Sequence, residues 1–470
     1  MIGVGFFLPL CIQSQQIQPL LTTAQMLQDL DTLASRIQAS HPYPTGYAKV
    51  EEWQAAMQIA KDSCAKGERD VIEFSLIVGR LLRTMQDSHT QVHVPSLWNQ
   101  HLNQTRRIIA FKTTGNRVSK DPLHLIPLGA ELLTLDGHPF EEIVSKFQPW
   151  LIQEKNSLDG MSRIQDQMFP VYFSILYLQQ QNHIVIHYKD LLGQEQSIDY
   201  PTWGTKEKEK YQRQNKALYE ELPKTEFRTD TAYLSIASFA PDKMAKQNRV
   251  IHRFFKQCEK KEIGQLIIDL RDNTGGKSTE VEYVMSYLLK DGYNAPHNII
   301  VKRSELSDGR VPWLKHWVVR KMLRLFFRKN EDIQRYVDLM ELKHGEVDTL
   351  YFNNNMKQKR WIYTGQTHLW VNGMSASAAV NFTQAFQQNQ LGTIWGQCIM
   401  GNDQGTFGNA APTQLPHSKI TVSIATIRYN YGPDFQFDHP NICPDKRIEY
   451  SIENIIHGTD PYWFAIRKKI

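Results

Sequence analysis

The sequence predicts an α/β protein with more than one domain, and three observations support this prediction. The chain has 470 residues, enough for roughly two to four domains of ordinary size. After residue 230, short apolar runs typical of buried parallel strands alternate with helical patterns. Residues 103–205 instead combine strand patterns with turn residues, which indicates a separate β-rich module.

The N-terminal part is predicted to contain a signal peptide followed by helices. Residues 2–12 are almost wholly apolar and polar residues follow at once, which is typical of a secretory signal at residues 1–15. A short buried strand is the alternative. Residues 16–102 form the next segment, which is predicted to be helical because apolar residues recur at helical spacing within 27–37 and 72–82.

Within the module at residues 103–205, residues 128–143 predict a strand, a turn and the start of a helix. The strand comes first, Asp136 and Gly137 form the turn, and Pro139-Phe-Glu-Glu-Ile opens the helix. A second strand is predicted at 184–188. The highly charged residues 204–224 then predict a linker or an exposed helix.

Residues 206–470 are predicted to form the α/β core, with an insertion at residues 302–362. Buried strands are predicted at 265–270, 369–371 and 393–395, helices at 242–260 and 376–388, and an alternating strand at 419–426.

The insertion contains a basic amphipathic helix at residues 313–329. One face is apolar and consists of Leu314, Trp317, Val318, Met322, Leu325 and Phe326. We expect this face to pack on the domain while the basic face stays in solvent. The alternative is a scaffold or peripheral membrane role, which predicts liposome binding that falls when four basic residues are neutralised, namely Lys315, Arg320, Arg324 and Arg328.

Composition excludes several classes of protein. Lys plus Arg number 54 and Asp plus Glu number 49, and a net charge of +5 over this length is too small to indicate nucleic-acid binding. The five cysteines form no CxxC pair, and His41, His89, His93 and His101 show no HExxH spacing. No apolar window reaches the length of a bilayer span. We therefore expect no metal, no cofactor and no nucleic-acid partner.

Three segments carry residues suited to chemistry. Gly275 and Gly276 follow the strand at 265–270, where glycines let the backbone approach a ligand and direct N–H groups toward it. Ser375 and Ser377 lie where a strand ends and a helix opens, so that the helix dipole favours an oxyanion there. The alternative is that these serines cap the helix. The third segment supplies His89, and histidine is the usual base for a serine nucleophile.

Together these segments resemble the tail-specific, or C-terminal processing, serine peptidases, in particular their exported Bacteroidetes-type branch. The resemblance runs from about residue 75 to the end, outside the insertion. It rests on Asp269-Leu-Arg-Asp-Asn-Thr-Gly-Gly, Ser375-Ala-Ser-Ala-Ala, Trp395-Gly-Gln-Cys, Gly408-Asn, Leu415-Pro-His-Ser-Lys and Asn441-Ile-Cys-Pro-Asp in this order. It implies a crotonase-like (ββα spiral) core, and it implies that residues 103–205 form a PDZ-like domain.

The resemblance also assigns roles to single residues. Ser377 falls on the nucleophile, with Ser375 as its local competitor. The region where many members carry a lysine base is Met400-Gly-Asn402, so the base is expected to be His89, in a segment where Ser88 replaces the family's glycine. The acid that orients the histidine would be Asp438, or Asp434 as the alternative. The oxyanion hole would use the backbone N–H of Ala378 and of Gly275 or Gly276.

These roles predict a serine endopeptidase that cleaves exported proteins or peptides in the periplasm or cell envelope through an acyl-enzyme. The alternative is a catalytically inactive relative that binds a peptide or a hydrophobic ligand. Cys398 and Cys443 lie in segments that the family places near the active site. An exported chain could join them in a disulfide, or both could be buried free thiols.

Overall fold

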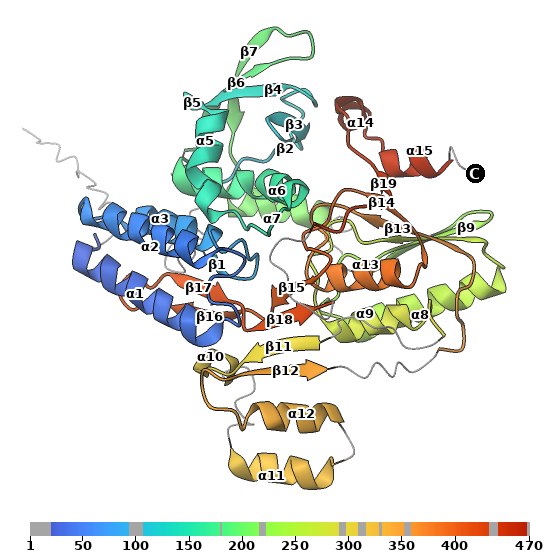
Figure 1. Ribbon diagram of the computed structural model, residues 1–470. Coiled ribbons are helices and arrows are strands. Elements are labelled where there is room, and N and C mark those ends of the chain that lie inside the picture. Colours follow the sequence, from blue (N-terminus) through green and yellow to red (C-terminus); the bar gives the residue numbers. More distant parts are fainter. Residues whose placement is uncertain are drawn as a thin grey trace, which may run out of the picture.

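The computed structural model describes residues 20–93, 107–178, 181–215, 222–290, 298–308, 316–328, 331–351, 359–431 and 440–467 (Figure 1). The predicted signal peptide at 1–15 lies outside these ranges. None of the helices in the described ranges has both the length and the apolar character that a bilayer span requires.

Three helices form the N-terminal segment, as predicted. They are α1 (Thr23–Ser40), α2 (Val50–Ala65) and α3 (Val71–Arg83). Thr22 and Gln25 form a capping box that satisfies the first N–H groups of α1, and Asp70 accepts the N–H of Glu73 at the start of α3. After α3, the short strand β1 (Gln91–Val92) pairs antiparallel with β17 (Thr421–Ile424). This pairing joins the segment that contains His89 to the C-terminal part of the chain.

The β-rich module contains a sheet in the order β2-β3-β4-β6-β7. Its strands are β2 (Lys112–Thr114), β3 (Arg117–Lys120), β4 (Glu131–Leu135), β6 (His183–Lys189) and β7 (Glu195–Pro201), and β5 (His138–Pro139) pairs with β4. Asp136 and Gly137 have φ of 50° and 79°, values typical of a tight hairpin turn. The module's helices are α5 (Phe140–Phe147), the short 3-10 helix η1 (Gln148–Trp150) and α6 (Leu158–Leu176), and α7 (Thr205–Gln214) follows as an exposed helix.

The core sheet has the order β19-β14-β13-β10-β9-β8. Its strands are β8 (Lys224–Phe227), β9 (Thr231–Ser235), β10 (Gln265–Asp269), β13 (Gln366–Val371), β14 (Gly392–Gly396) and β19 (Lys446–Arg447), and all neighbours except β8 and β9 run parallel. One face packs on α8 (Met244–Lys260), α9 (Ser278–Met285) and α13 (Ala378–Gln388), and the other on α15 (Pro461–Arg467), which follows α14 (Ile452–His457).

Both faces of β10 are buried, as its unbroken apolar run predicts. Leu266 and Ile268 pack among the residues of α8 and α13, whereas Ile267 packs with Trp370 on the opposite face. Because β10 and β13 are parallel neighbours, their carboxyl ends meet at one edge of the sheet, with Asp269 opposite Trp370. The glycine turn and the serine segment are therefore brought together at this edge.

A second sheet has the order β12-β11-β18-β15 and connects the core to the insertion. Its strands are β11 (Asn298–Lys302), β12 (Val347–Tyr351), β15 (Gly405–Gly408) and β18 (Ile427–Asn430); β16 (Ala411–Gln414) pairs with β17 instead. Between β11 and β12 the chain forms α10 (Glu305–Asp308), α11 (Trp317–Phe326) and α12 (Glu331–Leu339).

The prediction that the basic amphipathic helix packs its apolar face on the domain is wrong. No residue of α11 is buried, and Leu325 and Phe326 are each 70% exposed. The physical reason is that α12 lies nearer the sheet, because its Leu339 packs with Ile299 and Val301 of β11. In Figure 1, α11 lies on the side of α12 that faces away from the core. Leu314 and Lys315 lie outside the described residues.

Candidate active site

Ser377 stands at the start of α13, in a backbone conformation that non-glycine residues rarely adopt. Its φ is 53° and its ψ is −117°. The turn before it is held by Asn372, whose Oδ1 accepts the N–H groups of Asp272 and Met374, each at 3.0 Å. The Ser377 side chain does not cap α13, so the capping alternative is wrong for this serine. Strain of this kind is concentrated at functional sites.

Ser375 has a structural role instead. Its side chain is fully buried, its Oγ donates to the Leu270 carbonyl at 2.8 Å, and it accepts the N–H of Asn372 at 3.1 Å. The hydroxyl therefore joins the carboxyl ends of β10 and β13. Of the two serines considered, Ser377 is the one whose side chain is available for chemistry.

Ser377 and His89 line the same cavity, although 288 positions separate them in the chain. The cavity has a volume of about 490 Å³. Its remaining lining is mostly apolar and comes largely from α6 and from the neighbours of the two residues, namely Ile152, Ile164, Met168, Val171, Tyr172, Ile175, Met374 and Met400. The segment directly after His89 is held in place, because β1 pairs with β17 and Thr90 accepts the Ala425 N–H at 3.1 Å.

The backbone of His89 is held by Asp87, which in turn contacts His41, and both side chains are buried. Asp87 accepts the N–H of His89 through Oδ1 at 2.9 Å and contacts His41 Nε2 through Oδ2 at 3.1 Å. Since Tyr43 donates its N–H to His41 Nδ1, the His41 proton lies on Nε2 and is donated to Asp87. Burial alone would raise the pKa of Asp87, but the hydrogen bond and charge of His41, with the charge of His89, lower it.

A second acid, Glu154, lies on the other side of Ser88. Ser88 Oγ is 3.3 Å from His89 Nδ1 and donates to Glu154 Oε2 at 2.6 Å, and the Ser88 N–H donates to the same oxygen at 3.0 Å. Glu154 is almost completely buried and also accepts the Tyr47 hydroxyl at 3.2 Å. Burial and the charge of Asp87 raise the pKa of Glu154 to about 7.

The sequence did not identify Glu154. It lies between η1 and α6 in a segment with no catalytic motif, and its contact with Ser88 spans 66 positions. The one local signal was Ser88 itself, which stands where the family carries glycine and supplies the hydroxyl between His89 and Glu154. Burial, and secondarily the nearby His41, lower the pKa of His89, while Asp87 acts against this. His89 is therefore neutral at pH 7, as a general base must be.

The predicted oxyanion donors differ in their availability. The Gly275 N–H donates to Asn273 Oδ1 at 2.8 Å, so it is already engaged. Within the described residues, no acceptor is found for the N–H of Gly276 or of Ala378, the first residue of α13. A second cavity of about 210 Å³ is lined by these two residues and by Ser377, together with polar side chains from Ser278, Asn381, Thr406, Asn409 and Tyr429. Ser377 thus lies between an apolar cavity and a polar one.

Neither cavity has a lysine in its described lining. Met400 and Asn402 stand in the region where the family resemblance places a lysine base in many members. Met400 contributes an apolar wall to the larger cavity. Asn402 is buried and donates to the Tyr47 hydroxyl at 3.3 Å. Asp438 and Asp434, the predicted acids, lie outside the described residues.

One group of three side chains has the spacing of metal ligands. Donor atoms of Asp87, His89 and Glu154 lie within 4.8 Å of one another. Both carboxylates accept hydrogen bonds from protein groups, so these residues belong to one hydrogen-bonded network.

Cys398 and Cys443 form a disulfide, which decides between the two alternatives left open by the sequence. The Asp159 carboxylate, at the start of α6, accepts the N–H of Cys398 at 2.9 Å and pairs with Arg447 at 2.9 Å. These contacts fix the start of α6 against the core. Cys64 and Cys258 are buried free thiols.

Residues 230–447, which contain the glycine turn and Ser377, match the model of peptidase family S41. The chain carries an S41 serine peptidase domain. His89 and Glu154 come from the part of the chain that precedes the matched region. Comparison with curated proteins found no match.

Solved structures share the fold over nearly the whole chain. The mature form of CPAF is 13% identical with a TM-score of 0.65, and 95% of this chain and 97% of that chain are covered. CPAF in complex with lactacystin is 12% identical with a TM-score of 0.66, covering 95% and 98%. The photosystem II D1 C-terminal processing protease reaches a TM-score of only 0.44 at 11% identity, covering 93% and 97%. The S41 peptidase therefore has the mixed α/β fold of the CPAF structures.

Proposed function

We propose that this S41 peptidase is a serine endopeptidase in which Ser377 is the nucleophile and His89 the general base. The observation that carries the proposal is the meeting of the two residues in one cavity. The strained Ser377 backbone and the neutral His89 both support it. The proposal includes the crotonase-like core and the PDZ-like module that the sequence motifs imply.

In the proposed reaction, His89 Nε2 accepts the proton of Ser377 Oγ while the oxygen attacks the substrate carbonyl. The resulting oxyanion is bound by the N–H groups of Ala378 and Gly276, and the positive end of α13 adds to its stabilisation. The histidine then gives its proton to the leaving amine, and an acyl-enzyme forms. Water, deprotonated by the same histidine, releases the acyl group.

The orientation of His89 is proposed to depend on Ser88 and Glu154. When Glu154 is ionised, it accepts the hydroxyl proton of Ser88, and the Ser88 oxygen is then free to accept the proton on His89 Nδ1. This leaves Nε2 unprotonated toward Ser377. Asp438 remains a proposed acid from the family resemblance, with Asp434 as its alternative. Comparing kcat/KM of Asp438→Asn with that of Glu154→Gln tests which of the two acids orients His89.

The substrate side chain next to the cleaved bond is proposed to be apolar. The larger cavity is lined by Ile164, Met168, Val171 and Ile175 of α6, and its volume of about 490 Å³ suits a large aliphatic or aromatic side chain. The substrate is proposed to be an exported protein or peptide, and the enzyme to be periplasmic or in the cell envelope. The disulfide between Cys398 and Cys443 supports this, because such bonds persist in oxidising compartments.

The second candidate is an inactive relative that binds a peptide or hydrophobic ligand, which the apolar cavity also favours. Hydrolysis of unstructured peptides by wild type, Ser377→Ala and His89→Ala distinguishes the two. We expect each variant to lose at least about a thousand-fold in kcat while the fold is retained. Equal hydrolysis by all three proteins would show that Ser377 and His89 have no catalytic role. No hydrolysis by wild type, with retained peptide binding, would favour the second candidate.

A further inference from the structure

The hairpin of α11 and α12 forms a two-helix layer outside the S41 core (Figure 1). α12 packs on β11 and separates α11 from it. α11 is attached to α12 through Arg324, whose guanidinium pairs with Asp338 and with Glu341 at 2.7 Å each. Gln334 of α12 also donates to the Leu323 carbonyl at 3.3 Å, so the side of α11 that includes Leu323 faces α12 and the opposite side is presented to the outside.

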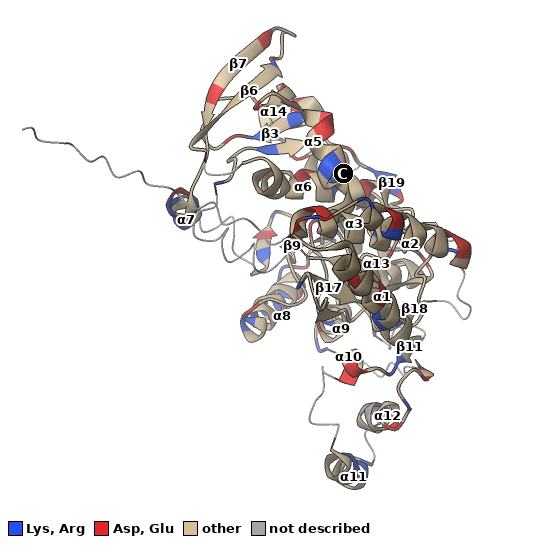
Figure 2. Ribbon diagram, turned by 90° about the vertical axis from the view of Figure 1, so that its left-hand side faces the viewer, with Lys and Arg blue, Asp and Glu red and all other residues tan. Residues whose placement is uncertain are grey.

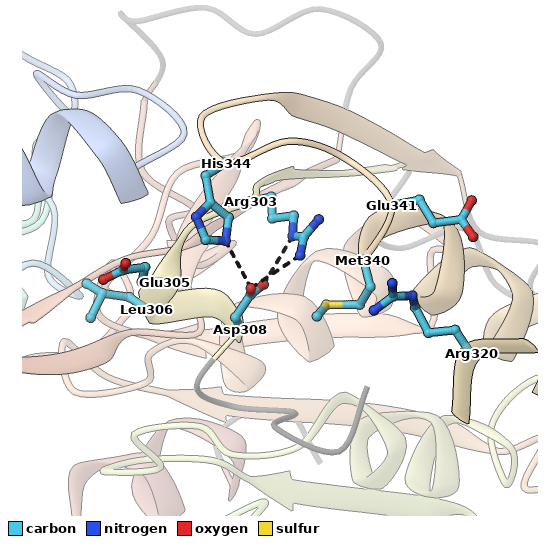
Figure 3. Close-up of a pocket in the computed structure, with 8 residues that line it drawn as sticks. All are labelled: Arg303, Glu305, Leu306, Asp308, Arg320, Met340, Glu341 and His344. Atoms are coloured by element: carbon cyan, nitrogen blue, oxygen red, sulfur yellow. Dashed lines mark hydrogen bonds and ion pairs between the residues drawn. The ribbon is translucent and has the colours of Figure 1, made fainter. Parts of the chain in front are cut away.

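The base of this hairpin is held by a partly buried ion cluster. Figure 3 shows Arg303 and His344 converging on Asp308, at 3.2 Å from Arg303 Nε to Oδ1 and 3.0 Å from His344 Nε2 to Oδ2. Burial acts to raise the pKa of Asp308, but the hydrogen bonds and charges of Arg303 and His344 lower it. The ionised carboxylate therefore ties α10 to the segment after α12 at the base of the hairpin.

α11 exposes a continuous apolar strip. Val318, Met322, Leu325 and Phe326 recur at spacings of three and four, which places them on one side of the helix, and they are 48%, 53%, 70% and 70% exposed. The side that includes Val319 and Leu323 is less exposed. Trp317, 66% exposed, stands at the first position of the helix. A strip of this size on one short helix is unusual for a surface that contacts only water.

Basic side chains flank this strip. Lys321 is exposed and lies beside the strip on α11, and Arg328 is exposed just after the helix ends at Phe326. No acidic residue occurs between Trp317 and Arg328. Figure 2 shows Lys and Arg on α11 at the outer end of the molecule. An apolar strip beside a basic one, with an aromatic residue at the helix end, matches an anionic lipid interface. Two copies of α11 packed strip to strip would bring like charges together.

We propose that α11 lies in the interface of an anionic membrane, with the apolar strip at the acyl boundary and Lys321 and Arg328 among the headgroups. The S41 peptidase would then work at a membrane surface without spanning it. The inference rests on the insertion alone and is independent of the chemistry at Ser377. It also reverses our expectation that the helix packs on the domain.

The test is sedimentation of the full chain with vesicles of phosphatidylcholine alone or with 30% phosphatidylglycerol. We expect wild type to bind the anionic vesicles and Leu325→Ser/Phe326→Ser to bind them at least about ten-fold more weakly. Lys321→Gln/Arg328→Gln should weaken binding roughly ten-fold at low salt. The matched control is Leu191→Ser/Leu192→Ser, two exposed leucines between β6 and β7, which should bind like wild type.

Circular dichroism and peptide hydrolysis in solution should be the same for wild type and all three variants, because none of the substituted residues is buried or near Ser377. Absence of wild-type binding to anionic vesicles would overturn the proposal. Undiminished binding of Leu325→Ser/Phe326→Ser would overturn it as well. A dimer in light scattering that Leu325→Ser/Phe326→Ser abolishes would instead identify a second copy of the chain as the occupant.

Discussion

Gly275→Ala tests whether the glycine turn and Ser377 form one catalytic unit. A Cβ on Gly275 would lie 2.6 Å from Ser377 Cβ and 2.8 Å from both Ala376 O and Ala378 N. Ordinary contact begins at 3.4 Å, so the nucleophile would have to move by 3.4 − 2.6 = 0.8 Å. Displacement of a reacting group by about 1 Å costs on the order of a hundred-fold in rate. We therefore expect kcat/KM to fall about a hundred-fold, mainly through kcat.

Backbone strain has to be separated from this displacement. Gly275 has a φ of +105°, where an alanine costs about 1–3 kcal/mol of stability. Gly137→Ala is the matched control, because Gly137 has a φ of +79° and no atom within 4 Å of its added Cβ. It should lose stability in urea denaturation but keep its activity within about two-fold.

The assay is hydrolysis of an internally quenched peptide with an apolar residue before the scissile bond. Each variant is first shown to be folded by circular dichroism. If Gly275→Ala keeps activity within about three-fold of wild type, the turn does not limit the position of Ser377. Our assignment of this edge of the sheet as the reaction centre would then be refuted.

Three further predictions concern Glu154, the disulfide and the cavity. Lowering the pH through about 7 protonates Glu154, so wild-type kcat/KM should fall there. Glu154→Gln should have a lower maximal kcat/KM, and its kcat/KM should begin to fall only at a lower pH. Because burial and the charge of Asp87 raise the pKa of Glu154 above its unfolded value, wild type should lose stability relative to Glu154→Gln as the pH rises from about 4.5 to 7 in denaturant titrations. The disulfide between Cys398 and Cys443 closes a loop with a sequence separation of 45. Cys398→Ser/Cys443→Ser should therefore lower the free energy of unfolding by up to about 4 kcal/mol. An unchanged free energy of unfolding would mean that the bond is absent in solution. Met168 lines the larger cavity, and Met168→Asp should lower kcat/KM for apolar peptides at least about ten-fold. The rate of reaction with a small fluorophosphonate should stay similar to that of wild type. An unchanged kcat/KM for apolar peptides would exclude the larger cavity as the substrate site.

The elements around the candidate site could be predicted where their signals are local. The apolar run before Gly275 specifies a buried strand, and the small residues after Val371 allow a tight turn into a helix. The patterns identified the two strands, and the family resemblance implied that Gly275 or Gly276 acts together with Ser377; the parallel pairing of β10 and β13 brings the two segments to one edge. The segment with His89 required the family resemblance in addition, because one histidine among 16 is no signal by itself.

Other features depend on contacts that local sequence does not encode. Glu154 approaches Ser88 only because the segment after η1 packs beside α3, and no spacing rule indicates such a contact. The periodicity of α11 correctly defined an apolar face, but it did not reveal that α12 occupies the neighbouring surface. Cys398 and Cys443 could be paired only once their distance was known.

Reaction with a fluorophosphonate, followed by intact mass and peptide mapping, tests the central claim most directly. We predict one adduct per chain on Ser377, absent from Ser377→Ala and retained in Ser375→Ala, whose serine is buried and structural. His89→Ala should react far more slowly, because no base then accepts the hydroxyl proton. A folded wild-type protein that forms no adduct, or an adduct that persists in Ser377→Ala, would contradict Ser377 as the nucleophile.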